Sequence, residues 1–302
     1  MPLFSRKEER SRKMIRTLTV LAVVLLGGLS NRLSAADDAE DLFALAAGYY
    51  NQQRWEAAAD QMSELLQAYP DHSRAPEAAF YRGEALMQTG DYPGAIAQFN
   101  EILERWPKHV RRAHVIFRVG ESAYLTGDHE NSERSLRNFV QSYPEDALAE
   151  FAYPYLGEIS VAAERWEQAQ RDFELALQKW PTGEMGERCR FGLGRAFDGQ
   201  GNWQEAQRFY RYVGYQGQSD LVDEALLNLA IIHFQAEQNE EAEKALARLI
   251  KTAPESPLRA RGWYLLGRIH QRHGDLEEAG NAYADGIAAA DPQDREITPA
   301  LL

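Results

Sequence analysis

The chain has 302 residues, of which 44% are hydrophobic, and it carries 46 Asp and Glu against 33 Lys and Arg. This composition is typical of a folded protein of one or two ordinary domains rather than of a disordered segment. The excess of acidic residues argues against nonspecific binding to nucleic acid or to anionic lipid. A single cysteine, Cys189, excludes an internal disulfide.

The N-terminal residues 1–36 have the order of a secretory signal peptide. A basic stretch is followed by an apolar run over residues 18–29 and by small residues up to Ala36, after which we expect cleavage. The apolar run is shorter than the ~20 residues that span a bilayer, so cleavage is favoured over a retained anchor, and no stable membrane insertion is expected afterwards. Translation from Met1 or from Met14 leaves this order intact.

From residue 39 onward, the sequence repeats with a period of 37 residues. Four segments end in an aromatic residue followed by a proline, at Pro70, Pro107, Pro144 and Pro181. A small residue recurs at the same interval, with one step of 36, at Ala46, Gly83, Gly120, Gly157, Gly194, Ala230 and Gly267. A second ladder of small residues runs through Ala58, Ala95, Ser132, Ala169, Ala206, Ala242 and Ala279. A fixed period of this length indicates stacked repeats.

Each repeat has helical apolar spacing that is interrupted once, which predicts two helices joined by a turn. In residues 76–107 the turn falls at Gly90, which allows a left-handed helix end, and Asp91 then caps the second helix. The same turn recurs at Gly127, Gly201 and Gly274. The proline ends the second helix because it has no N–H to donate. The small residues predict close helix crossings, since helices approach to about 8–10 Å only over short side chains.

Three repeats depart from this pattern. In the fourth, Pro154 lies inside the first helix and is expected to shorten or kink it. In the fifth, Gly214 and Gly217 replace the aromatic–proline ending, which predicts a looser joint and a bend before the sixth repeat. The last helix of the seventh is rich in alanine, so its exposed stripe is small but is a candidate docking surface.

These features resemble the tetratricopeptide repeat, a helix pair with a small residue at position 8, Ala at 20, a large apolar residue at 24 and Pro at 32. Position 24 is occupied here by Met62, Phe99, Leu136, Phe173, Tyr210, Leu246 and Tyr283. The resemblance implies an all-α fold, a solenoid of about seven antiparallel helix pairs wound into a superhelix. The implied repeats fill residues 37–296, as 39–75, 76–112, 113–149, 150–186, 187–222, 223–259 and 260–296, and they leave 297–302 as a tail.

No motif of a known catalytic centre is present, such as H-E-x-x-H, G-x-S-x-G or C-x-x-C. His270 and His273 share a helical face near Asp275, but a zinc site usually needs three or four converging ligands. A solvated helix end is therefore favoured over a metal site. Cys189 is expected to be a partly buried thiol without a resolving partner. Neither a cofactor nor a metal is expected.

In the resembling family, positions 2, 5, 9 and 12 of the first helices line a concave groove that binds partners. Transferred to this sequence, they give a partner-binding surface made of Phe80, Glu84, Phe117, Glu121, Glu158, Arg188, Phe191, Arg195, Tyr264 and Arg268. The phenylalanines would form an apolar stripe, and the charges would make the groove acidic over repeats 2–4 and basic at repeats 5 and 7. The alternative is that position 5 is buried against the neighbouring helix pair.

Export and repeats that end in Tyr-Pro are similar to the periplasmic tetratricopeptide proteins of the bacterial envelope, the class of the Tol–Pal coordinator and the outer-membrane assembly lipoprotein. The resemblance implies a non-enzymatic scaffold that binds a protein or peptide partner, and no nucleic acid, in cell division or outer-membrane assembly. The implied location is the periplasm, with the outer membrane reached through a partner in a membrane-protein complex. Two alternatives stay open: a structural subunit that docks by its terminal repeats, and a metal-dependent enzyme with a cryptic site at His270 and His273.

Overall fold

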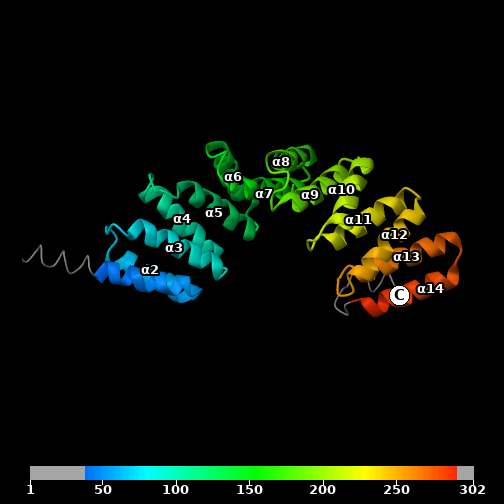
Figure 1. Ribbon diagram of the computed structural model, residues 1–302, viewed down its shortest axis with the longest axis horizontal. Coiled ribbons are helices and arrows are strands. Elements are labelled where there is room, and N and C mark those ends of the chain that lie inside the picture. The colour runs from blue at the N-terminus through cyan, green and yellow to red at the C-terminus, as the bar shows by residue number, and fades with distance from the viewer. Residues whose placement is uncertain (1–37, 291–302) are drawn as a thin grey trace, which may run out of the picture. The chain divides into compact units, whose positions relative to one another are not determined.

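The computed structural model describes residues 38–290 as helices joined by short turns, with no strand in that range. The expected signal peptide and the tail at 297–302 lie outside the described residues. A first helix covers residues 38–51. The helices that follow are α2 (Trp55–Ala68), α3 (Ala75–Gln88), α4 (Tyr92–Arg105), α5 (Arg112–Leu125), α6 (His129–Ser142), α7 (Ala149–Ala162), α8 (Trp166–Lys179), α9 (Gly186–Gly199), α10 (Trp203–Gln216), α11 (Val222–Gln235), α12 (Asn239–Thr252), α13 (Arg259–His273) and α14 (Leu276–Ala289) (Figure 1). The predicted all-α fold is confirmed.

The chain divides into two compact units, one up to Ser135 and one from Leu136 onward. In the first unit, α2 contacts α3, α3 contacts α4, and α4 contacts α5. In the second unit, every helix from α7 to α14 contacts the next one along the chain (Figure 1). Each unit is therefore a helical solenoid that is stabilised by contacts between neighbours. Over 38–290, no helix combines the length and apolarity that are needed to cross a membrane.

The first ladder of small residues lies where the two helices of a pair cross. A methyl group built on Gly157 would lie 2.5 Å from the Phe173 ring, which leaves no room for a side chain. The same clash occurs in the pairs Gly83–Phe99, Gly194–Tyr210 and Gly267–Tyr283. Where the larger residue is aliphatic, as in Ala46–Met62 and Ala230–Leu246, the small residue is alanine. The third repeat differs, because the Ser132 hydroxyl donates a hydrogen bond to the Gly120 carbonyl at 2.8 Å.

Four of the turns within helix pairs have the predicted geometry. Their glycines have φ between 72° and 88°, namely Gly90, Gly127, Gly201 and Gly274. The carboxylates of Asp91 and Asp128 accept hydrogen bonds from the N–H of Gly94 and of Asn131, at 3.0 Å and 3.1 Å, and so cap the second helices. Asn202 caps α10 in the same way, whereas Asp275 makes no such bond to α14.

The aromatic–proline pairs end the second helices, as predicted. The aromatic residue is the C-cap of α2, α4 and α8, at Tyr69, Trp106 and Trp180. Two residues after the proline, a side chain accepts a hydrogen bond from a backbone N–H two positions further on, as in the pairs His72–Arg74, His109–Arg111, Asp146–Leu148 and Ser256–Leu258. This turn directs the chain into the next first helix.

Pro154 does not shorten its helix, so that expectation is wrong. It lies inside α7, which has the same 14 residues as most other helices. The fixed φ of proline suits a helix, and near the N-terminus its missing N–H removes only one early hydrogen bond.

The joint after the fifth repeat is not loose, although it lacks the proline. α10 ends at Gln216, and the Glu187 carboxylate of α9 accepts hydrogen bonds from the N–H groups of Gln218 and Ser219, at 3.0 Å and 3.1 Å, and from the Ser219 hydroxyl. Burial raises the pKa of Glu187, but these bonds outweigh it and hold the pKa below its ordinary value. A carboxylate thus fixes the loop that a proline orients elsewhere.

Candidate functional site

The phenylalanines of the expected groove are buried. Phe80, Phe117 and Phe191 are 4%, 2% and 2% exposed. The ring centroid of Phe80 lies 6.3 Å from that of Phe99, and Phe191 lies 5.7 Å from Tyr210, in each case on the second helix of the same pair. The expected apolar stripe on the surface is therefore wrong, and the alternative of burial holds. Helical apolar spacing marks the face that packs, and it does not separate a core from an apolar groove.

The charged residues of the first unit form a cluster rather than a bare acidic surface. Arg118 of α5 donates to the buried carboxylate of Glu84 on α3, at 2.9 Å and 3.0 Å, and to Glu121 at 2.5 Å. Burial raises the pKa of Glu84 above its ordinary value, and the Arg118 guanidinium only partly offsets this. The two expected acidic residues are thus brought together, by an arginine that the groove positions do not include.

In the second unit, Glu158 of α7 and Arg195 of α9 form an ion pair at 2.7 Å. Arg195 also lines a hollow of about 500 Å³, together with Trp166, Asp198 and Asn228. Burial raises the pKa of Asp198 above its ordinary value. A half-buried arginine beside a hollow is suited to binding a polar group of a partner.

The remaining expected residues of the second unit lie at the surface. Arg188 of α9 is exposed, and so is Arg268 of α13. Arg268 donates to the Tyr264 hydroxyl at 3.3 Å and lies over the Tyr264 ring at 5.9 Å. Tyr264 and Arg268 are therefore brought together by their spacing of one helical turn.

The ion pairs between repeats include partners that the sequence reading missed. Arg137 donates to both carboxylate oxygens of Asp172 on α8, at 2.6 Å and 2.5 Å, and Asp172 is buried. Glu84–Arg118 and Arg137–Asp172 join residues 34 and 35 positions apart, and Glu158–Arg195 joins residues 37 apart. Opposite charges at about one repeat length were the signal that could have identified Arg118 and Arg137.

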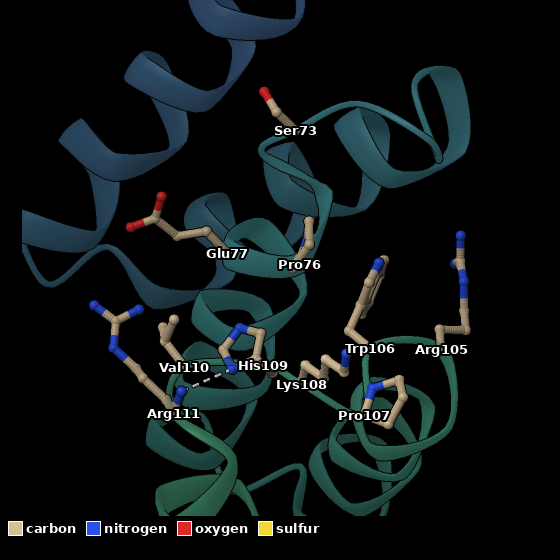
Figure 2. A pocket seen from close by; sticks show the side chains of 10 residues that line it. All are labelled: Ser73, Pro76, Glu77, Arg105, Trp106, Pro107, Lys108, His109, Val110 and Arg111. Carbon is tan, nitrogen blue, oxygen red and sulfur yellow. Dashed lines mark hydrogen bonds between the residues drawn. The ribbon is translucent and has the colours of Figure 1, made fainter.

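A larger hollow, of about 610 Å³, lies at the linker between α4 and α5 (Figure 2). It is lined by linker residues 105–111 and by Ser73, Pro76 and Glu77 at the start of α3. Val110 is 92% exposed there. The linker was read from the sequence only as the end of a helix, so this hollow was missed.

The described residues contain no cluster of three or more His, Cys, Asp or Glu side chains that could hold a metal ion. His273 lies 2.8 Å from the side-chain nitrogen of Asn239, so its ring nitrogen has a partner on a neighbouring helix. Cys189 is buried, and burial raises the pKa of its thiol to about 12, so the thiol is not an activated nucleophile at neutral pH.

The sequence profile of the tetratricopeptide repeat matches residues 43–110, 114–146 and 227–295, which together make up more than half of the chain. No curated protein is similar to the chain at a significant level.

Solved structures share the fold at low sequence identity. The C-terminal part of a tetratricopeptide-containing protein from Cytophaga hutchinsonii has a TM-score of 0.67 and 14% identity, over 86% of this chain and 99% of that one. PilF from Pseudomonas aeruginosa has a TM-score of 0.55 and 19% identity, over 75% and 97%. PilW, a type IV pilus biogenesis factor, has a TM-score of 0.59 and 17% identity, over 76% and 100%.

Proposed function

Because this chain belongs to the tetratricopeptide repeat family, we propose that it is a non-enzymatic adaptor that binds a protein or peptide partner. The observation that supports this most is the placement of charge on the first helices. Arginines and glutamates of consecutive first helices meet in ion pairs, as in Glu158–Arg195, and Arg188 and Arg268 are exposed on the same set of helices. Exposed arginines beside half-buried ion pairs favour the recognition of a polar partner surface.

We further propose that the adaptor is exported and acts in the bacterial envelope. The order of basic, apolar and small residues in 1–36 supports export. PilF and PilW share the fold, and PilW is a pilus biogenesis factor, so an envelope role is consistent with the range of functions this fold carries. Residues 1–36 fused to alkaline phosphatase, which is active only after export, should give activity in bacterial cells. Activity equal to that of a fusion without residues 1–36 would overturn export.

Binding is tested by capture from envelope extract with the full chain as bait. In the test variant, Arg188→Glu and Arg268→Glu reverse two exposed charges on first helices. The control is Arg208→Glu together with Lys244→Glu, which makes the same charge change on the second helices α10 and α12, where both residues are exposed.

Partners that are captured by the native chain and by the control, but not by the test variant, would support the proposal. Partners retained by all three proteins would mean that binding uses another surface, such as the exposed face of α14. A chain that captures nothing would contradict the adaptor function itself.

A further inference from the structure

The six linkers between repeats allow a comparison within one chain, and the second linker differs from the others. Its third residue is Lys108, where the equivalent residue is acidic in three other linkers, at Asp71, Glu145 and Glu255. Its fifth residue is Val110, where others have Ser73, Ala147, Glu184 and Pro257. The shared turn does not need these changes, because His72 and Asp146 make the same hydrogen bond as His109. The departures at this linker therefore need another reason.

The hollow at this linker has an apolar wall that is open to solvent. Trp106, Pro107 and Pro76 contribute to its lining, and Val110 lies beside them with 92% of its surface exposed. Figure 2 shows the linker from Trp106 to Arg111 facing the first turn of α3. A volume of about 610 Å³ is in the range of sites that hold a few side chains of a ligand.

The cations at the hollow are only partly neutralised. Arg105 is paired with Glu101 at 2.6 Å, and the one acidic residue of the lining, Glu77, is taken up by Arg74 at 2.9 Å. Arg111 stacks on the Phe80 and Tyr81 rings. Among the described residues, neither Arg111 nor the exposed Lys108 has a carboxylate within ion-pair distance.

We propose that this hollow binds an acidic peptide segment of a partner protein, with an apolar side chain of the segment on Val110 and Trp106 and its carboxylates on Lys108 and Arg111. The proposal rests on the adaptor function above and assigns the partner's chemistry and place of contact. The patch is small, and the chain as a whole has a net charge of -13. A short acidic segment therefore fits better than nucleic acid or an anionic membrane, both of which need an extended basic face.

The test uses the full chain and a short fluorescein-labelled peptide in which Asp and Glu surround a central Leu-Phe pair. A second peptide with Asn and Gln in place of the acids is the ligand control. The variant Lys108→Glu with Val110→Ala gives the second linker the residues of the third, Glu145 and Ala147, so it is expected to fold. Lys251→Glu makes the same type of charge reversal at an exposed lysine on α12.

We expect the acidic peptide to bind the native chain and Lys251→Glu equally, and the linker variant to bind about tenfold more weakly or worse. Affinity should also fall with added salt and with the amide peptide. Equal binding by the linker variant would overturn the proposal. So would self-association of the native chain that the linker variant abolishes, because the occupant would then be a second copy.

A peptide array of unbiased composition separates this proposal from the adaptor function. Array peptides that bind equally to the native chain and the linker variant would overturn the linker site and leave the adaptor function standing. An array on which no peptide binds would contradict both.

Discussion

Phe173 occupies the space in which a side chain at position 157 would lie, so the packing of the fourth helix pair depends on two residues at once. The same interdependence links the other glycine–aromatic pairs, and it explains why alanine appears only opposite Met62 and Leu246. A position of this kind is sensitive to a single methyl group because the interior is close-packed.

Gly157→Ala is expected to lower the free energy of unfolding by about 1–3 kcal/mol, since the added methyl must displace the Phe173 ring. Phe173→Leu in the same chain should recover part of this loss, because it recreates the combination of Ala230 and Leu246. Urea denaturation of the two single variants and the double variant measures the coupling. Additive losses would mean that the two residues do not share one space.

Arg118→Ala should destabilise the first unit by about 2–4 kcal/mol, because Glu84 would stay buried without its cation. The pKa of Glu84, already raised by burial, should rise further. A raised carboxyl pKa means that the folded state holds the proton more tightly than the unfolded state does. The loss should therefore be largest above that pKa and shrink as the pH falls through it.

Denaturation of Arg118→Ala at a series of pH values, monitored by circular dichroism, checks this. The double variant Arg118→Ala with Glu84→Gln is the control, since a neutral amide removes the buried charge. A loss that does not depend on pH, or that the double variant does not reduce, would contradict the role assigned to Arg118.

The helices and their order could be predicted because the signals are local: apolar spacing, Gly90-type turns and aromatic–proline endings all act within one repeat. The site could be predicted only in part. Whether Phe80 faces a groove or a core depends on Phe99, and whether Glu84 is bare depends on Arg118, which lies a whole repeat away. Such pairings are made by the fold, so periodicity along one helix does not contain them.

Among the linkers, the loop after α10 shows that one function can be met by different chemistry. Elsewhere a proline and a short side-chain acceptor orient the chain, whereas here Glu187 reaches from the previous linker and holds Gln218 and Ser219. Glu150 stands one repeat earlier and accepts a longer bond, 3.4 Å, from the Met185 N–H. Its linker keeps Pro181, so it depends less on the carboxylate.

Glu187→Ala should therefore speed amide hydrogen exchange at Gln218 and Ser219, whereas Glu150→Ala should change exchange at Met185 much less. The pKa of Glu187 is lowered in the folded chain, so its contribution is present above the unfolded value of ~4.3 and is lost as the pH falls through the folded value. Native protection of the loop should fall on acidification, and that of Glu187→Ala should not. Equal protection in both proteins at neutral pH would contradict the role of Glu187.

Over the whole chain, stability comes from contacts between neighbouring helices, so the last described helix, α14, has a partner on one side only. Its Leu276 and Ile287 are 70% and 43% exposed. The residue equivalent to Ile287 on α12 is Ile250, which faces Gly262 of α13 and is partly buried. Two isoleucines at one repeat position thus differ in whether a following helix covers them.

Ile250→Lys should destabilise the chain by about 1–3 kcal/mol, because it places a charge in the joint between α12 and α13. Ile287→Lys should change the free energy of unfolding by no more than about 0.5 kcal/mol, since its side chain is already solvated. Thermal and urea denaturation of the matched pair give the comparison. Equal losses would indicate that another part of the protein covers α14.

The ion pairs between repeats also restrict how the chain could be rearranged. Glu84 needs the arginine that the next repeat supplies, and so does Glu158, whereas between Arg137 and Asp172 the signs are reversed. Each joint therefore carries its own arrangement of charge, like a numbered seam. Shuffled repeats would bury charges without partners, so a longer chain would have to arise by duplicating neighbouring repeats together with the joint between them.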